Sequence, residues 1–336
     1  MDNNEEKNIT LDMGGGGYKS AEIISELRKF FPATGKWKNC EDDSASFNLG
    51  KEKILFTTDG FIIDPIFFPG GDIGKIAVCG TINDLAVMGA KPLGISLSIV
   101  IEEGFPKSDF LKIMKSIGDV SRQAGVPIVT GDTKVTEKGK IDKIEITTSG
   151  VGMAKNVISN GGVKPGDVII SSGDLGEHTV ALLSVRFGYK SNIKTDSKPL
   201  NKELELVGKY LHAAKDPTRG GLAANIVEMA EKSKVKIILE EHLLPYKKET
   251  IAIAGLLGID MLSFASEGRF IAAVAEKDAQ KVLKLLKKFN SEAKIIGHAH
   301  SASRNEAGRP RVFLKTKLGS LRPIETPRGK LVPRIC

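Results

Sequence analysis

Residues 70–90 read GGDIGKIAVCGTINDLAVMGA and carry the strongest indication of the fold class. Its long apolar run, with glycines at both ends, predicts a buried helix that ends at Gly89. Short β-branched runs lie on both sides of it, KILFTTDG at residues 53–60 and GISLSIVI at residues 94–101. Runs of this kind, closed by Gly or Asp, are typical of strands. The alternation of strands and helices predicts an α/β (α+β) fold.

The alternation continues along the chain and changes near its middle. Residues 106–125 predict a second helix, and residues 126–132 and 143–154 predict two more strands. The Gly- and Pro-containing segment between Lys155 and Lys164 is typical of a linker. A second block follows, for which we expect helices near 178–188, 201–214, 219–233 and 278–289 and a strand at 269–276.

The length of 336 residues is long for one hydrophobic core. We therefore expect two domains, over residues 1–155 and 156–317, and a tail over residues 318–336. The tail carries several prolines and shows no hydrophobic period. We expect it to be a flexible arm.

Composition narrows the class of protein. With 41% hydrophobic and 27% charged residues, the chain has the composition of a typical globular protein. No stretch approaches the roughly 20 apolar residues that span a bilayer, and the polar, acidic N-terminus lacks the features of a secretory signal. We expect a cytoplasmic protein with no membrane contact. The net charge of +8 is spread along the chain and only 6% of residues are aromatic, so nucleic-acid binding is poorly supported, and an anionic small ligand fits as well.

Three cysteines, Cys40, Cys79 and Cys336, are too few and too far apart for a disulfide framework or a zinc cluster. The last of them ends the chain behind the basic, proline-bearing sequence LVPRIC. A solvated thiol without a role is the simplest interpretation of such a residue. An odd thiol at an exposed terminus is nevertheless a candidate reactive group.

Four consecutive glycines precede a predicted helix in residues 13–20, MGGGGYKS. Gly14, Gly15, Gly16 and Gly17 could turn several backbone N–H groups towards one anion, as phosphate-binding loops do. A P-loop would need Gly immediately before Lys-Ser, and a Tyr stands there instead. A flexible linker remains the alternative interpretation.

Acidic residues recur at the ends of predicted strands. A single Asp at a strand end is commonly a turn former or a cap, but open sheets also gather ligand groups there. An Asp within the apolar helix is more informative, because a buried unpaired carboxylate costs several kcal/mol that a cation would remove. Converging carboxylates are how Mg²⁺ is held beside phosphates, and Lys134 could add a positive charge. The residues are Asp42, Asp43, Asp59, Asp84 and Asp132.

Two further motifs lie in the second block. In KDPTRGGL, Asp216 is predicted to cap a helix with Pro217 at its first position. Arg219 in a first turn opposes the helix dipole, and a bound anion would explain it. In FASEGRF, Glu267 suits either an ordinary loop carboxylate or a general base.

Together these motifs carry a resemblance. The segments FFPGGDIGKIAVCGTINDLAVMGAKP, IVTGDTKV, DPTRGGL, FASEG and PRIC resemble the HypE family of NiFe-hydrogenase maturation proteins, in the PurM-like ATP-binding superfamily. The five motifs occur in the right order from the glycine cluster to the last residue, which makes the match specific. One departure is Met13, where the family often has His before the glycines.

The resemblance implies a PurM-like two-domain fold, with an N-terminal mixed sheet that pairs in a homodimer, a C-terminal α/β sandwich and a flexible tail. It implies that a HypF-like carbamoyltransferase carbamoylates the sulfur of Cys336. The protein would then use ATP, with ADP and phosphate as products, to dehydrate this S-carboxamide to a thiocyanate. The cyanide would pass through a HypC–HypD-like complex to the iron of the hydrogenase centre.

The resemblance also implies a division of roles among the candidate residues, with ATP and Mg²⁺ as cofactors. Phosphorylating an amide oxygen makes phosphate the leaving group, so the site needs a triphosphate cradle, metal ions, a lysine and a base. The implied catalytic residues are Cys336, Lys134 and Glu267. The implied nucleotide-binding residues are Gly14, Gly15, Gly16, Gly17, Asp42, Asn83, Lys134, Asp216 and Arg219. The implied metal ligands are Asp43, Asp59, Asp84 and Asp132.

Several alternatives stay open. A selenophosphate synthetase would carry Cys or selenocysteine by the glycine loop, and this chain has neither there. Aminoimidazole ribonucleotide synthetase and thiamine-phosphate kinase share the ATP cradle but do not require a terminal cysteine. A non-enzymatic carrier that merely presents Cys336 to partners is the alternative from another class. A lipid anchor fits poorly, because a prenylation box places three residues after its cysteine.

Overall fold

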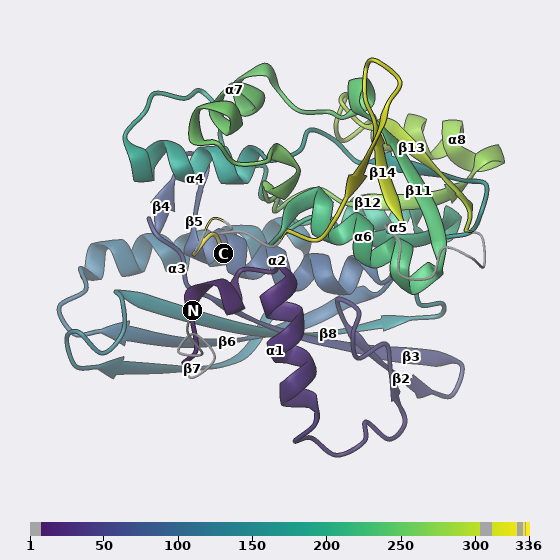
Figure 1. Ribbon diagram of the computed structural model, residues 1–336. Helices are drawn as coiled ribbons and strands as arrows, with labels where there is room; N and C mark the ends of the chain where they lie inside the picture. Colours follow the sequence, from purple (N-terminus) through teal and green to yellow (C-terminus); the bar gives the residue numbers. More distant parts are fainter. Residues whose placement is uncertain (1–7, 303–310, 328–331, 333) are drawn as a thin grey trace.

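The computed structural model describes residues 8–302, 311–327, 332 and 334–336 and contains two α/β domains (Figure 1). The first domain is a six-stranded mixed sheet in the order β1-β2-β3-β8-β6-β7, in which only β6 and β7 pair in parallel. The expected mixed sheet is thereby confirmed. Its strands are β1 Trp37–Lys38, β2 Ala45–Leu49, β3 Glu52–Phe61, β6 Lys91–Glu102, β7 Ile128–Thr136 and β8 Ile144–Ala154.

Helix α2, Ile73–Val87, is the centre of the first domain, as the opening stretch predicts. Asp72 begins it by accepting a hydrogen bond from the Lys75 N–H at 3.0 Å, and Gly89, with φ of +81°, follows its end. The helix is buried almost throughout, because the sheet and α3, Lys107–Ala124, pack on it. Also in this domain are α1 Tyr18–Arg28, the 3₁₀ turn Leu11–Gly14, and the short hairpin of β4 Phe67–Phe68 and β5 Gly71–Asp72.

The second domain is a seven-stranded sheet in the order β10-β12-β9-β13-β11-β14-β15. Helix α6 packs on one face, and α5 and α8 pack on the other. The strands are β9 Asp167–Ser171, β10 Leu211–Lys215, β11 Val235–Glu240, β12 Ile271–Ala275, β13 Lys294–Ser301, β14 Val312–Lys315 and β15 Leu321–Ile324. The helices are α4 Glu177–Phe187, α5 Asn201–Val207, α6 Gly221–Ser233, α7 Lys248–Leu257 and α8 Glu276–Leu286, with 3₁₀ turns at Gly208–Tyr210, Glu241–Leu243 and Met261–Ser263.

Apolar packing joins the two domains. Leu85 and Met88, at the end of α2, lie in one hydrophobic cluster with Leu204 of α5 and Phe270 beside β12. This interface holds α2 against the second domain. Residues of the second domain can therefore contribute to one site together with residues of α2.

Two expectations need correction. The helix expected at 201–214 ends at Val207, and Leu211–Lys215 forms strand β10, because these residues pair with the buried strand β12. The tail expected from 318 does not begin as a free arm, because Leu321–Ile324 pairs with β14 as the edge strand β15. Of the rest of the arm, residues 328–331 and 333 lie outside the described residues.

Across the part of the chain that the structure describes, there is no helix with the length and apolar character to span a bilayer.

Candidate active site

Three carboxylates meet at the junction of the two domains. Asp43 precedes β2, Asp84 lies on α2, and Asp216 directly follows β10. Their ligand atoms all lie within 4.8 Å of one another. The Thr57 hydroxyl donates to Asp84 Oδ2 at 2.8 Å, and Asp59, two residues further along β3, lies close enough to raise the pKa of Asp84. The chain therefore brings together three of the four expected metal ligands and adds Asp216.

Burial makes this cluster electrostatically unfavourable as it stands. Burial, together with the charges of Asp59, Asp216 and Asp43, raises the pKa of Asp84 well above its usual range. Burial and the Asp43 charge raise the pKa of Asp216 to about 8, and Asp216 Oδ2 is buried without a hydrogen-bond partner. A divalent cation with hard oxygen ligands would remove both costs, so the residues fit Mg²⁺.

We expect the metal-free protein to lose stability as pH rises from about 4 to about 8. The folded-state pKa of Asp216 is about 8, whereas a free Asp titrates near 3.9, so the unfolded chain releases its proton first and each rise in pH favours unfolding. Melting temperatures in EDTA should be lower at about pH 8 than at about pH 6. Excess Mg²⁺ should remove most of this difference. A melting temperature in EDTA that rises with pH over this range would contradict the argument.

Lys215 was not among the expected site residues, although it stands beside Asp216. Its side chain is only 12% exposed and forms ion pairs with Asp43 and with Glu228 on α6. Lys215 is the first residue of the KDPTRGGL motif. Nothing near it in the sequence indicates that Asp43, 172 positions earlier, is its partner. It supplies one fixed positive charge at the edge of the cluster.

The glycine loop and Arg219 lie together, as an anion site would require. Arg219 Nη1 donates to the Gly14 carbonyl at 3.2 Å. Gly16 has φ of +81°, and a Cβ there would lie 2.5 Å from Arg219 Cβ, so this close approach requires glycine. The Gly16 N–H donates to Ser20 Oγ in the first turn of α1, and Gly17 is the residue that begins that helix.

Arg219 itself does not occupy a first helical turn. Helix α6 begins at Gly221 with Gly220 as its N-cap, so the predicted capping role of Asp216 and the first-turn position of Arg219 are wrong. The charges of Cys336, Asp59, Glu267 and Asp84 raise the pKa of Arg219, against an opposing effect of burial. Arg219 is thus a partly solvent-exposed cation close to the carboxylates.

Glu267 lies deep in the same site. Its side chain is 2% exposed, Oε1 has no hydrogen-bond partner, and burial, with the charges of Asp216 and Asp196, raises its pKa well above the usual range. A carboxylate with a raised pKa is a stronger base once it is ionised, which suits it to accept a proton. Of the two interpretations of FASEGRF, the buried position favours a general base.

Asn83 bonds the backbone of the second domain. Its Nδ2 donates to the carbonyls of Lys198 and Glu267, each at 3.2 Å, and its Oδ1 accepts from the Leu200 N–H at 2.8 Å. The amide is thus engaged by three backbone groups of the second domain. One of these bonds holds the backbone of Glu267 in place, and the expected contact of Asn83 with a nucleotide stays a prediction.

Asp42 is likewise engaged elsewhere. Its carboxylate accepts from Lys232 Nζ, Ser159 Oγ and Asn39 Nδ2 at 2.8–2.9 Å. These bonds tie the loop before β2 to the second domain. They leave its neighbour Asp43 as the residue that points into the cluster.

Asp132 and Lys134 do not reach this cluster within the chain. They lie on the edge strand β7, form an ion pair with each other, and are 60% and 73% exposed. Asp59 on β3 is aligned with Thr148, Leu97 and Gly131 across the sheet, so Asp132 is three strand spacings, about 14 Å, from it. The expectation that Asp132 converges with the other carboxylates is therefore wrong for a single chain.

The end of the chain is docked into the same site. Ile335 is buried in the core of the first domain, and Cys336 packs against that core beside α2 (Figure 1). Burial and the Glu267 charge raise the pKa of the Cys336 thiol to about 12, while Arg219 opposes them. The thiol, the candidate base and Arg219 thus lie near one another within one chain.

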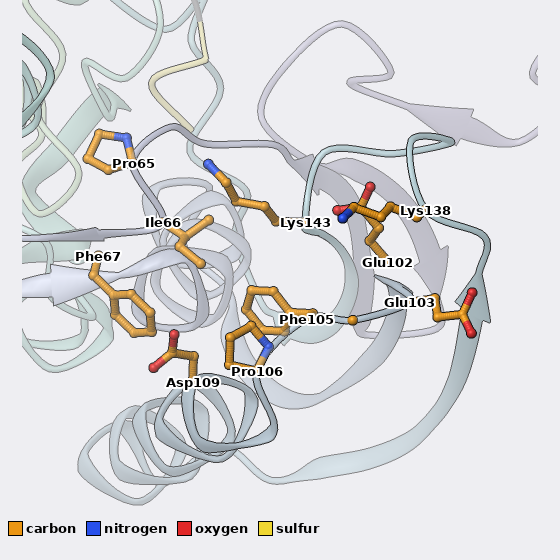
Figure 2. A pocket seen from close by; sticks show the side chains of 11 residues that line it. Pro65, Ile66, Phe67, Glu102, Glu103, Phe105, Pro106, Asp109, Lys138 and Lys143 are labelled. Carbon is orange, nitrogen blue, oxygen red and sulfur yellow. The ribbon is translucent and has the colours of Figure 1, made fainter.

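A separate pocket lies away from the carboxylates. It has a volume of about 450 Å³ and combines apolar side chains, among them Ile66, Phe67 and Phe105, with charged ones such as Glu102 and Lys143 (Figure 2). None of the candidate site residues lines it. We assign the chemistry to the interdomain cluster instead.

Two family models match the two domains of the chain. Residues 41–154 match the family model of the AIR synthase related protein N-terminal domain, and residues 164–308 match that of the C-terminal domain. A putative hydrogenase expression/formation protein of Methanocaldococcus jannaschii is 45% identical over 98% of this chain and 99% of its own length. Carbamoyl dehydratase HypE of Cupriavidus necator is 40% identical over 98% of this chain and 95% of its own.

The chain belongs to the HypE family.

Solved structures of HypE give the same result. HypE in a HypE–HypF complex superposes with a TM-score of 0.83 at 38% identity, over 91% of this chain and 100% of that one. HypE in complex with ATP superposes with a TM-score of 0.81 at 36% identity, over 98% and 100%. The expected PurM-like, HypE-type two-domain fold is thereby confirmed.

Proposed function

We propose that this HypE-family chain is an ATP-dependent carbamoyl dehydratase that acts on the S-carboxamide of its own Cys336. The observation that carries the proposal is the position of Cys336, which packs against the first-domain core, close enough to Arg219 and Glu267 for their charges to interact. A relative named carbamoyl dehydratase HypE, 40% identical over nearly the whole chain, supports the reaction type. The HypE structure in complex with ATP supports the nucleotide.

The reaction balances with ATP as the only co-reactant. The amide oxygen of R–S–CO–NH₂ attacks the γ-phosphorus of ATP, and ADP leaves. Loss of phosphate and of both N–H protons then gives R–S–C≡N, so that ATP and the carboxamide become ADP, phosphate and the thiocyanate. Glu267 would take a proton from the amide nitrogen, because it is the buried carboxylate beside the thiol.

The remaining residues would bind the nucleotide. Gly14 to Gly17 and Arg219 would face the triphosphate, and Asp43, Asp59, Asp84 and Asp216 would hold Mg²⁺. The metal would offset phosphate charge during transfer. Arg219 would also sit near the amide oxygen, where negative charge develops as the phosphoryl group arrives.

Lys134 requires a second chain under this proposal. Its exposed position on β7, with Asp132, faces away from its own cluster. We propose that the outer face of the first sheet pairs in a homodimer and that Lys134 reaches a triphosphate there. Exposed apolar residues on the same side of that sheet as Lys134, namely Phe56 of β3 and Val151 of β8, support a covered face.

Lys134→Ala should leave carbamoylation of Cys336 intact and stop nitrile formation, because a charge on the phosphates is lost. Mass spectrometry of the carbamoylated variant after addition of Mg-ATP would measure this. Lys138→Ala, a nearby lysine that lines the separate pocket, is the control and should retain normal nitrile formation. Thiocyanate formed at the normal rate by Lys134→Ala would refute the phosphate contact.

We further propose the partners that this chemistry needs. A HypF-like carbamoyltransferase would load Cys336, as the known HypE–HypF complex suggests. A HypC–HypD-like complex would receive the cyanide for the iron of the hydrogenase. The cytoplasm suits this cycle, because the terminal thiol must stay reduced between rounds.

Intact-protein mass spectrometry tests the proposed function. The purified chain is incubated with a HypF-like partner, carbamoyl phosphate and ATP, and afterwards with Mg-ATP alone. We expect a gain of one carbamoyl group and then a loss of one water that depends on ATP hydrolysis. Carbamoylation without loss of water would favour a carrier that only presents Cys336 to partners. No modification would overturn the proposal.

A further inference from the structure

A buried histidine contacts the end of the chain. His178, in the first turn of α4, is fully buried and packs edge-on against Phe68, with 5.3 Å between ring centroids. Its Nε2 lies 2.7 Å from the carbonyl oxygen of Ile335, and its Nδ1 lies 2.8 Å from Thr195 Oγ1. It belongs to neither the carboxylate cluster nor the glycine loop.

The surrounding hydrogen bonds fix which nitrogen carries the proton. The Ser197 N–H donates to Thr195 Oγ1 at 3.1 Å, so the Thr195 hydroxyl is free to donate its own hydrogen to Nδ1. Burial lowers the pKa of His178 to about 4, so the ring is neutral at physiological pH. The single ring proton then lies on Nε2 and points to the Ile335 carbonyl.

Arg186, at the other end of α4, contacts the preceding residue of the tail. Its Nη2 donates to the Arg334 carbonyl at 3.1 Å, while its Nε donates to the Asp64 carbonyl at 3.0 Å. The Asp64 N–H donates to the Arg334 carbonyl at 3.3 Å, and the Ile62 N–H donates to a main-chain oxygen of the terminal residue Cys336 at 3.4 Å. The last three residues thus bind beside the end of β3 as a short added strand would.

The backbone of Arg334 indicates that these contacts hold the tail in a specific bend. Arg334 has φ of +54°, a left-handed conformation that is uncommon for a residue with a side chain. Its guanidinium also pairs with Asp142 at 2.5 Å, but both groups are partly exposed, so this ion pair adds little. The carbonyl contacts of the tail carry the docking instead.

We propose that His178 and Arg186 form a clamp on the backbone carbonyls of the C-terminal tail and position the Cys336 sulfur for dehydration. They are positioning residues, because they touch the tail backbone and not the reacting group. This inference rests on the proposed function for its consequence, but the clamp itself is a physical contact. Since it binds backbone, it holds a free, a carbamoylated and a cyanated Cys336 alike.

The three cysteines allow a direct test in the unmodified full-length protein. Cys336, which is partly exposed in the docked tail, reports tail release, the likewise partly exposed Cys40 is an internal reference, and Cys79, with no exposed surface, reports unfolding. Each is quantified by peptide mass spectrometry after timed exposure to iodoacetamide at about pH 7.5. His178→Phe keeps a flat ring against Phe68 but cannot donate a hydrogen bond.

We expect His178→Phe to raise the alkylation rate of Cys336 about tenfold, because a buried carbonyl loses its donor, while Cys40 and Cys79 react as before. His178→Gln, which can still donate, should restore much of the protection. His212→Phe is the matched control: His212 bonds Asp167 through Nδ1, away from the tail, and this variant should leave Cys336 unchanged.

An unchanged Cys336 rate in a folded His178→Phe variant would overturn the clamp. If Cys79 also becomes reactive, that variant has lost its fold, and Arg186→Met decides. Arg186→Met should raise the alkylation rate of Cys336 several-fold. An alkylation rate equal to that of the unaltered chain would overturn the proposal.

The consequence for catalysis is a split between two steps. Transfer of the carbamoyl group from a HypF-like partner needs a released tail, so His178→Phe should carbamoylate at least as fast as the unaltered chain. Dehydration by Mg-ATP needs a docked tail and should slow by about tenfold. Failure of the proposed function would appear as no carbamoylation of any variant, and the alkylation result would still decide whether the clamp exists.

Discussion

Cys336→Ala is expected to abolish carbamoylation completely, the largest single effect that the structure predicts. No other thiol can replace it, because Cys79 is fully buried and Cys40 lies on the loop before β2 and not on the docked tail. The fold should persist, since Cys336 packs only at the edge of the first-domain core. The measurement is intact mass after incubation with a HypF-like partner, carbamoyl phosphate and ATP.

Cys40→Ala is the control for this result and should be modified as the unaltered chain is. The Mg-ATP-induced rise in melting temperature should be the same in both variants, which separates loss of the acceptor from loss of nucleotide binding. A carbamoyl mass gain in Cys336→Ala would refute the assignment of the carrier residue.

Asp84→Asn is expected to change stability in opposite directions with and without metal. In the metal-free protein, Asp84 must either stay charged beside Asp43 and Asp216 or hold a proton far above its ordinary pKa. Two unit charges about 5 Å apart repel by about 3 kcal/mol at an effective dielectric constant of about 20. The amide removes this cost while it can still accept the Thr57 hydroxyl. We expect the free energy of unfolding in EDTA to rise by about 1–3 kcal/mol.

The same variant should lose most of its stabilisation by Mg-ATP, because one charged ligand of the cation is gone. A loss of about 3 kcal/mol of binding corresponds to an affinity lower by about 100-fold. Denaturant titration in EDTA and in excess Mg-ATP measures both effects. Asp119→Asn on the exposed surface of α3 is the control. It should change the free energy of unfolding by no more than about 0.5 kcal/mol, both in EDTA and in excess Mg-ATP. A less stable metal-free Asp84→Asn would contradict the proposed repulsion.

Local sequence patterns predict the elements of this fold better than its site. The run that becomes α2 is long, apolar and bounded by glycines, so its helix could be recognised without tertiary information. Leu211–Lys215 has no comparable signal. The segment continues a helical pattern, and only its pairing with the buried strand β12 makes it a strand.

Among the candidate metal ligands, too, local sequence indicates some residues and tertiary contacts decide others. Asp59 and Asp84 could be suspected from their strand-end and mid-helix positions, whereas Asp216 resembles an ordinary helix cap in sequence. Its role arises because the end of β10 meets α2, a contact between domains that no local pattern contains. Asp132 shows the opposite case. It stands at a strand end in the sequence, but the strand order places β7 at the edge of the sheet, away from the cluster.

The tail that docks into its own chain makes the protein a reagent as well as a catalyst under the proposed function. Ile335 and Cys336 contact His178 and the end of β3 of the same subunit. Each copy therefore presents one acceptor per round. Because the substrate is part of the protein, its concentration cannot be changed independently of the protein concentration. A Michaelis constant cannot be defined for the carboxamide, and no excess of it can saturate the site. The yield of cyanide per round equals the number of loaded copies, so the supply is set by how fast partners load and empty the tail.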